Sequence, residues 1–499
     1  MPPVRATHGA LRPTGPQTGA GVNAPTSGPA KPEAAFNRRQ AQACRPWCVL
    51  ACILTLTLGT LPSKAAPVPA HPLRYSAQIR WTQYGIPHIA ADDLGGLGFG
   101  AGYAFAEQNA CLLFDTALTV RGERSQYLGP QGEATAGFAT VRNIESDIFF
   151  RSYFDVASLA AGYRNGSPDS LALLQGYVAG ANRYLAQTGV NKLPAACRGA
   201  PWVRPLTFDD IVLMMAQKAV EASGSIFISA ILNAAPPGAI ERPLRTPASI
   251  APPAALPKPG QAGSNAYALG KDLTASGHAI LVGNPHFPWQ GHNRFFEMQL
   301  TVPGRLDVMG ATLLPLPVIN IGFNRDVAWS HTVSTGRRFT LFELHLVPGH
   351  PLEYRVDGHI ESIKARTVIV PSVDANRVPG QVAHTVYETR FGPIVAEPMM
   401  GLKWTSETAF ALADAEAGNT RLVEQWLRLN EAKSVSDIRS ALADVQGAPW
   451  VNTIAADRGG AVLYADYSVV PAVSDALLQE CKGSVPAQQL AAKSAMPVL

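Results

Sequence analysis

The sequence predicts an α+β fold, in which sheets are covered by helices, and three observations support that prediction. Apolar residues recur at helical spacing within residues 67–235, strand-like runs dominate after position 264, and a proline-rich stretch separates the two parts. With 499 residues, of which 47% are hydrophobic and 16% charged, the chain can bury a large core and is too long for one simple small domain. We therefore expect a helix-rich segment followed by a strand-rich one.

The charge balance excludes one broad class of partner. A formal charge of +4 is slight for a chain of 499 residues, and no basic stripe with interleaved aromatic residues is present. We therefore do not expect nucleic acid as a partner.

The first 66 residues are predicted to be a leader. Residues 1–43 are rich in Gly, Pro, Ala and Thr, which indicates a disordered extension or an upstream start site. Residues 44–66 are typical of a signal peptide, because an arginine precedes an apolar run from Trp47 to Leu61 and small residues follow it. The run is short for a membrane span. We expect an exported protein, periplasmic or secreted, without a stable membrane span; an uncleaved anchor is the alternative.

The cysteines leave two pairings open. Three of the six lie in the predicted leader: Cys44, Cys48 and Cys52. The other three allow either a bridge between Cys111 and Cys197 with Cys481 unpaired, or a partner for Cys481 outside this chain. Cys111 lies in an apolar helical pattern, so a free buried thiol is a further alternative there. No cysteine or histidine spacing indicates a metal site, and we expect no cofactor.

The segment 67–235 is predicted to be mostly helical. It opens with a strand pair, 75–81 and 86–90, around a Tyr-Gly turn. Helical spacing then covers 98–118 and runs from Ser167 to about Ala222, with Thr207 as the cap of a second helix in that stretch.

Residues 236–263 are predicted to be a spacer. Prolines recur every few residues from Pro236 to Pro259, so this stretch can hold neither a helix nor a sheet. An interdomain linker that is never cut is the alternative.

After the spacer the pattern changes to short runs rich in β-branched and aromatic residues. The predicted strands are 279–283, 294–302, 318–323, 327–330, 338–345 and 366–371. Two helices are predicted at 420–429 and 434–445, and a hairpin is predicted at 450–455 and 461–466.

The stretch Gly263-Ser264-Asn265-Ala266-Tyr267-Ala268-Leu269-Gly270 carries the predicted chemistry. It fits a short buried strand that opens directly after the spacer. If the peptide bond before Ser264 were cut, that residue would hold a nucleophile and a base, since an α-amine has a pKa of about 7.7–8.0. The Ser264 hydroxyl could itself attack the carbonyl of Gly263, which has no side chain to block it.

Five further runs share the order and spacing of one known family. They are Tyr84-Gly85-Ile86-Pro87-His88-Ile89, Gly122-Glu123-Arg124-Ser125, Asn284-Pro285-His286-Phe287-Pro288-Trp289, Gly304-Arg305-Leu306-Asp307-Val308-Met309-Gly310 and Trp329-Ser330-His331-Thr332-Val333. With Ser264, the chain resembles the N-terminal-nucleophile hydrolases of the penicillin acylase family, most closely the branch of acyl-homoserine-lactone and aculeacin-type acylases.

The resemblance implies a four-layer αββα sandwich with Ser264 at the start of a core strand. It also implies a precursor that cuts itself, leaving an α-chain (67–235) and a β-chain (264–499) as a heterodimer, with 236–263 as a spacer propeptide.

The resemblance also implies site residues. His286 would lie near the Ser264 amine, and the backbone N–H of Val333 would serve the oxyanion hole. Phe287, Trp426 and Trp450 would line an apolar acyl pocket, and Asn320 would contact the amide region of a ligand. Taken singly, each of these aromatic residues is more typical of plain core, but together, at the family's spacing, they favour a hydrophobic slot.

The family places an asparagine oxyanion donor and an arginine well downstream of the region that matches 451–457. This sequence ends at Leu499, before such a run, and Asn452 does not fit the motif. The resemblance therefore predicts a C-terminally truncated β-chain.

The expected function is that of an exported, self-processing acylase. It would hydrolyse the amide bond of small acyl amides such as acyl-homoserine lactones or lipopeptides. The alternatives are a penicillin or cephalosporin acylase, and an inactive truncated remnant. A lipase-type triad is not expected, because no Gly-x-Ser-x-Gly elbow is present.

Overall fold

The longest helix begins where the sequence supplies a capping side chain. Helix α1 spans Leu94–Val120, and the carboxylate of Asp93 accepts a hydrogen bond from the Gly96 N–H at 2.7 Å. This satisfies one of the amides that every helix start leaves without a partner. The computed structural model describes residues 75–239, 263–313, 316–494 and 498–499. The predicted leader with its three cysteines, and most of the predicted spacer, lie outside the described residues.

The segment before the predicted spacer is mainly helical, as predicted. After α1 come α2 (Arg124–Leu128), α3 (Asn143–Tyr153), α4 (Val156–Asn165), α5 (Pro168–Thr188), α6 (Phe208–Ala219) and α7 (Ile228–Leu232). Thr207 caps α6 as predicted, because its hydroxyl accepts from the Asp210 N–H. The hairpin of β3 (Glu133–Ala136) and β4 (Ala139–Arg142) was not predicted.

Helices α1 and α5 pack with their backbones in direct contact, because glycines lie where they meet. A Cβ atom at Gly98 would come within 2.1 Å of the Leu173 carbonyl oxygen, and one at Gly102 within 2.1 Å of the Tyr177 carbonyl oxygen. No side chain fits in that space. The four-residue spacing of these glycines keeps them on one face of α1, so two turns of the helix approach α5 closely.

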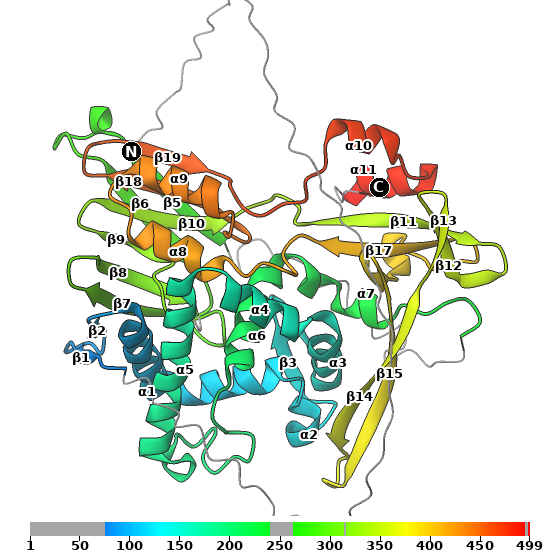
Figure 1. Ribbon diagram of the computed structural model, residues 1–499, viewed down its shortest axis with the longest axis horizontal. Coiled ribbons are helices and arrows are strands. Elements are labelled where there is room, and N and C mark those ends of the chain that lie inside the picture. Colours follow the sequence, from blue (N-terminus) through cyan, green and yellow to red (C-terminus); the bar gives the residue numbers. More distant parts are fainter. Residues whose placement is uncertain (1–74, 240–262, 314–315, 495–497) are drawn as a thin grey trace, which may run out of the picture. The chain divides into compact units, whose positions relative to one another are not determined.

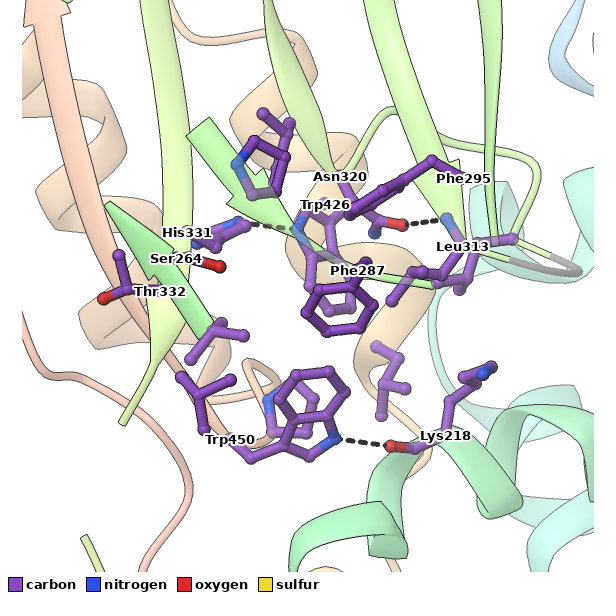
Figure 2. A pocket seen from close by; sticks show the side chains of 17 residues that line it. Lys218, Ser264, Phe287, Phe295, Leu313, Asn320, His331, Thr332, Trp426 and Trp450 are labelled. Atoms are coloured by element: carbon purple, nitrogen blue, oxygen red, sulfur yellow. Dashed lines mark hydrogen bonds between the residues drawn. The ribbon is translucent and has the colours of Figure 1, made fainter. Parts of the chain in front are cut away.

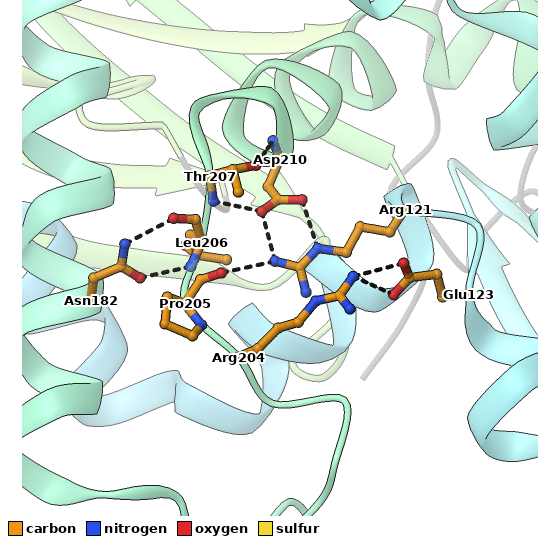
Figure 3. A network of polar contacts seen from close by, with 8 residues as sticks. All are labelled: Arg121, Glu123, Asn182, Arg204, Pro205, Leu206, Thr207 and Asp210. Carbon is orange, nitrogen blue, oxygen red and sulfur yellow. Dashed lines mark hydrogen bonds and ion pairs between the residues drawn. The ribbon is translucent and has the colours of Figure 1, made fainter. Parts of the chain in front are cut away.

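A polar network joins the end of α1 to the start of α6 (Figure 3). The guanidinium of Arg121 donates to both carboxylate oxygens of Asp210, at 2.7 and 2.6 Å, and both side chains are buried. Asp210 also accepts from the Thr207 N–H, so one carboxylate serves the helix cap and the ion pair. Beside it, Arg204 donates to both oxygens of Glu123. This network fixes α6, whose other end reaches the site described below.

The larger sheet contains strands that precede the predicted spacer in the sequence and strands that follow it (Figure 1). Its order is β1-β2-β7-β8-β9-β10-β18-β19, and every pair is antiparallel except β2 with β7. The strands are β1 (Gln78–Trp81), β2 (Pro87–Ala90), β7 (Phe295–Val302), β8 (Leu306–Leu313), β9 (Ile321–Asn324), β10 (Val327–Val333), β18 (Val451–Asp457) and β19 (Val462–Ala465). Strand β8 was missed, and the strand predicted at 318–323 lies at β9.

A two-stranded ribbon lies on one face of this sheet, over β10 and β18. It consists of β5 (Gly263–Leu269) and β6 (Ile280–His286). Gly283 lies directly against the sheet, since a Cβ atom there would come within 2.8 Å of the Ser330 hydroxyl. The predicted strand at Ser264 is thus confirmed, but the prediction that it is buried is wrong for its outer face. Strand residues alternate between two faces, and Tyr267 on the outer face is 64% exposed.

Helices cover the opposite face of the sheet. They are α8 (Leu422–Asn430) and α9 (Val435–Val445), both predicted. Successive strand residues point to opposite faces, and while Ser330 meets the ribbon, His331 bonds to Trp426 of α8. Helices, sheet and ribbon therefore lie in that order, which confirms the mixture of helices and sheets that the sequence predicts.

The second sheet contains seven antiparallel strands in the order β13-β12-β11-β17-β16-β15-β14. They are β11 (Phe339–Val347), β12 (His350–Val356), β13 (His359–Ser362), β14 (Lys364–Val373), β15 (Pro379–Thr389), β16 (Gly392–Val395) and β17 (Thr408–Asp414). Only β11 and β14 were predicted. Two short helices, α10 (Asp475–Glu480) and α11 (Val485–Ser494), follow in the chain.

One cysteine pairing of the two predicted is present. A disulfide joins Cys111 of α1 to Cys197, and Cys481 is free and exposed. In the described part of the chain no single helix is long and apolar enough to cross a membrane. One bent pair of helical stretches, Phe208–Ala222 with Gly224–Leu232, satisfies the length and composition together.

Candidate active site

An apolar pocket opens beside Ser264, between the ribbon, the larger sheet and helices α6 and α8 (Figure 2). The cavity is narrow, with a volume of about 30 Å³. The lining residues are Lys218, Ser264, Pro285, Phe287, Phe295, Leu313, Leu316, Asn320, Ile321, His331, Thr332, Val333, Leu422, Trp426, Pro449, Trp450 and Val451. Six of the seven residues predicted for catalysis or substrate binding are in this set; His286 is not.

Ser264 is the second residue of β5 and faces the sheet. Its hydroxyl donates to the carbonyl oxygen of Gly263 at 2.6 Å. The nucleophile predicted from the sequence therefore lies against the carbonyl group that it would attack during self-cleavage. Pro285 lies opposite Ser264 in the ribbon, so no side-chain amide or charge from β6 competes for the hydroxyl on that side.

His286 lies at the end of β6, directly opposite Gly263. Its Nδ1 is 3.6 Å from the position that a Cβ atom of Gly263 would occupy, and its Nε2 is 3.0 Å from the side-chain nitrogen of Asn284. The residue is exposed. Its imidazole thus lies beside the Gly263–Ser264 stretch and is not among the residues that line the apolar pocket.

Val333 ends β10 and lines the pocket. The next residue, Ser334, donates its N–H to the Trp450 carbonyl on β18 at 3.0 Å. Successive amides of a strand point in opposite directions, so the Val333 N–H points away from β18. On that side β9 pairs with β10 only at Ala328 and Trp329. Within the described residues, no strand pairs with Val333 there.

Two aromatic rings form one wall of the pocket. Phe287 and Trp450 are stacked, with ring centroids 6.1 Å apart and planes 11° apart. Phe295 contacts Phe287 from β7, at a centroid distance of 5.3 Å. The indole Nε1–H of Trp450 donates to the carbonyl oxygen of Lys218 at 2.8 Å. The wall is therefore apolar, while its one polar group is satisfied outside the cavity.

A second wall consists of Trp426 and His331. Nδ1 of His331 is 3.0 Å from the Asn452 carbonyl oxygen, and Nε2 is 3.0 Å from the indole nitrogen of Trp426. A carbonyl only accepts and an indole N–H only donates, so Nδ1 carries the proton and the ring is neutral. Burial agrees with this state, because it lowers the pKa of His331 to about 4.

Asn320 lies at the inner end of the pocket and is 3% exposed. Its side-chain oxygen accepts from the Leu313 N–H at 2.7 Å, and its backbone carbonyl accepts from the Trp329 indole at 2.6 Å. Its side-chain nitrogen has no partner among the described residues. One buried donor without a partner thus lies in the wall of a mainly apolar cavity.

Lys218 was missed by the sequence analysis, because a lysine in an apolar helix gives no sign of a pocket. Its ammonium group donates to Glu221 at 2.7 Å and to the side-chain oxygen of Asn293 at 2.5 Å. Burial lowers the pKa of Lys218, although the adjacent carboxylate opposes that shift. The charged end is therefore bound by polar groups, and its side chain points away from the aromatic wall (Figure 2).

His331 was also missed, although it lies inside a quoted run between Trp329 and Val333. The strand alternation places its side chain on the helix-covered face, and that placement could have been predicted. Among the described residues, no group of three or more His, Cys, Asp and Glu side chains could hold a metal ion.

Comparisons with known proteins give sequence matches over most of the chain. A sequence model of the penicillin amidase family matches residues 76–497. The chain is 40% identical over 443 residues to acyl-homoserine lactone acylase PvdQ of Pseudomonas putida, which covers 88% of this chain and 56% of that protein. It is 42% identical over 454 residues to aculeacin-A acylase of Actinoplanes utahensis, which covers 89% of this chain and 57% of that protein.

Among solved structures, a thermostable penicillin G acylase from Alcaligenes faecalis aligns at 18% identity with a TM-score of 0.34, over 40% of this chain and 34% of that chain. The chain spans about half the length of the curated relatives it matches. The predicted resemblance is confirmed by the sequence matches: the chain belongs to the penicillin amidase family.

Proposed function

We propose that this protein is a self-processing acylase that hydrolyses the amide bond of N-acylated substrates through an N-terminal Ser264. The observation that carries the proposal is the position of the Ser264 hydroxyl. It lies 2.6 Å from the Gly263 carbonyl oxygen and lines an apolar pocket. One oxygen atom can therefore serve two reactions, cleavage of its own chain and attack on an acyl amide.

Maturation would start with attack of the Ser264 oxygen on the Gly263 carbonyl carbon. The acyl group moves from nitrogen to oxygen, and water then hydrolyses the ester. The products are a carboxylate on Gly263 and a free α-amine on Ser264. Residues 236–263 would be the spacer between an α-chain and a β-chain, which stay together as a heterodimer.

Catalysis would use the new amine as the base. Its ordinary pKa of about 7.7–8.0 lies near working pH. It accepts the hydroxyl proton as Ser264 attacks the substrate carbonyl, and it returns that proton to the leaving amine. The acyl-serine ester is then hydrolysed by water. We assign His286 to positioning this amine, since it lies opposite Gly263.

The Val333 N–H would donate to the oxyanion that forms on the substrate carbonyl. Its direction away from β18 supports the role. One such donor contributes about 2.7–4 kcal/mol to the stability of a transition state.

The acyl chain would lie against Phe287, Trp426 and Trp450, and the unpaired side-chain nitrogen of Asn320 would donate to a ligand oxygen. An acyl-homoserine lactone or a lipopeptide acyl chain fits this lining, because the pocket offers apolar contacts and one buried donor. The names of the two curated relatives agree with this substrate class.

We also propose a four-layer fold for the protein and its export from the cytoplasm. The ribbon of β5 and β6 would belong to the sheet that packs on the larger sheet in a four-layer αββα sandwich. The Cys111–Cys197 bridge favours export to the periplasm or the medium, since disulfides persist in oxidising compartments.

The test has two readouts on one preparation. Denaturing electrophoresis with N-terminal sequencing should show two chains, one of which begins at Ser264. Incubation with dodecanoyl-homoserine lactone should release dodecanoate, measured by mass spectrometry. Ser264→Ala should abolish both, while Ser276→Ala, in the exposed turn of the same ribbon, should preserve both. An uncut wild-type chain that still releases dodecanoate would refute the mechanism.

A further inference from the structure

The turn of the β3–β4 hairpin reaches the aromatic wall of the pocket from behind. Phe138 lies in that turn, between β3 and β4. Its ring meets Trp450 edge-on, with centroids 5.4 Å apart and planes at 73°, and meets Phe287 at 6.5 Å and 66°. Phe138 does not line the cavity. It supports both rings of the wall at once, from a segment that precedes the spacer.

The turn that carries Phe138 is held in place. Gly137 has a φ of +61°, a conformation that glycine adopts at little cost. A Cβ atom there would come within 2.7 Å of the Ser225 side chain and 3.2 Å of the Glu221 backbone. The turn therefore lies directly on the helical stretch after α6, and the Phe138 ring has little room to retreat from Trp450.

Helix α6, directly before that stretch, holds Trp450 through a hydrogen bond. The Trp450 indole donates to the Lys218 carbonyl, and the Lys218 ammonium is bound by Glu221 and Asn293. Lys218 and Glu221 are buried. Trp450 is thus fixed at its nitrogen by α6 and at its ring by Phe138. Phe287 meets the Phe138 ring as well.

We propose that Phe138 is a positioning residue that decides which acyl chains the pocket accepts. It acts through Phe287 and Trp450 and rests on the proposed function, since it presumes that the pocket holds an acyl chain. Without the Phe138 ring, the Phe287 ring can move into the vacated space and the pocket widens on that side. Wider acyl groups then gain affinity relative to straight chains.

Free fatty acids test this without requiring turnover. We would measure dissociation constants by isothermal titration calorimetry for a straight-chain series from hexanoate to hexadecanoate, and for phenyl-terminated acids of matched length. The proteins are the wild type, Phe138→Ala and Phe138→Leu. Phe342→Ala is the matched control, because Phe342 is also partly buried and stacks on another ring, Phe391, but in the second sheet.

Phe138→Ala should change the ratio of the two dissociation constants about two- to tenfold in favour of the phenyl-terminated acids, the range expected for loss of an aromatic pair. Phe138→Leu should restore part of the ratio. Phe342→Ala should lower thermal stability and leave the ratio unchanged. An unchanged ratio in Phe138→Ala, with wild-type binding intact, would overturn the inference alone. A wild type that binds no fatty acid would overturn the acyl pocket itself.

Discussion

The indole N–H of Trp426 donates to Nε2 of His331 across 3.0 Å, in the wall of the apolar pocket. The opposite ring nitrogen of His331 bonds to the Asn452 carbonyl, so both nitrogens of the imidazole are used. The histidine is therefore a fixed acceptor that holds Trp426, and it offers no free polar atom to an acyl chain. A residue of this kind shapes a binding site and takes no part in proton transfer there.

Replacing His331 with leucine should destabilise the protein by about 1–3 kcal/mol, because the buried Trp426 N–H loses its acceptor. His331→Gln keeps an acceptor oxygen and should lose less. Urea denaturation followed by circular dichroism measures both. Equal losses in the two variants would show that volume, and not the hydrogen bond, decides the effect.

The pH dependence of stability should also report His331. Its pKa in the folded protein is about 4, below the ordinary value of 6.5. Between these values the unfolded chain binds a proton that the folded chain does not, so stability falls as the pH falls from 6.5 to 4 and rises in the reverse direction. The contribution is about 1.4 kcal/mol per pH unit at most. It is constant above pH 6.5.

The difference between wild type and His331→Gln isolates this contribution, since other groups titrate equally in both. Their stability difference should shrink, or reverse, as the pH falls from 6.5 towards 4. Parallel curves over that range would mean that His331 takes up a proton equally readily in the folded and the unfolded chain.

Local rules account for much of the fold that the sequence predicted. Thr207 and Asp210 form the cap of α6 within one turn of chain, and α8 and α9 follow their apolar spacing. The prediction of a buried strand at Ser264 was wrong on one face for a physical reason. The alternation of Ala266 and Tyr267 shows that the strand has two faces, but not whether anything covers both.

The residues of the candidate site also fall into two groups, those that local sequence predicts and those that depend on long-range contacts. Ser264 and Phe287 stand in runs that the sequence alone marks. Trp450, in contrast, bonds to Lys218 over 232 positions of sequence, and Trp426 bonds to His331 over 95. Such contacts depend on how separate elements pack, so no pattern within a short window can predict them. The sequence did not predict a role for Phe138 for the same reason, since its contacts with Phe287 and Trp450 form only when the β3–β4 hairpin packs against them.

The buried ion pair between Arg121 and Asp210 should contribute far more to the free energy of unfolding than an exposed ion pair does. Asp210→Asn keeps the shape of the side chain but leaves the buried Arg121 without a counter-charge. We expect a loss of about 3–5 kcal/mol of unfolding free energy. The control is Asp169→Asn, which breaks a half-exposed pair with Arg305 and should cost less than about 1 kcal/mol. Similar losses in urea melts of the two variants would contradict the burial argument.

The Cys111–Cys197 disulfide should stabilise the helical segment, because it joins positions 86 residues apart. The double variant Cys111→Ala and Cys197→Ala should lose about 2–5 kcal/mol of unfolding free energy, since the unfolded chain gains freedom when the cross-link is absent. Calorimetry with and without dithiothreitol separates the cross-link from the two side chains. The wild type should melt at a lower temperature in the reductant, and the double variant should not respond. Cys481→Ser should behave as the wild type does, because that thiol is free and exposed. A wild-type melting temperature that is indifferent to dithiothreitol, while mass spectrometry shows the bridge to be reduced, would mean that helix packing alone holds Cys111 beside Cys197.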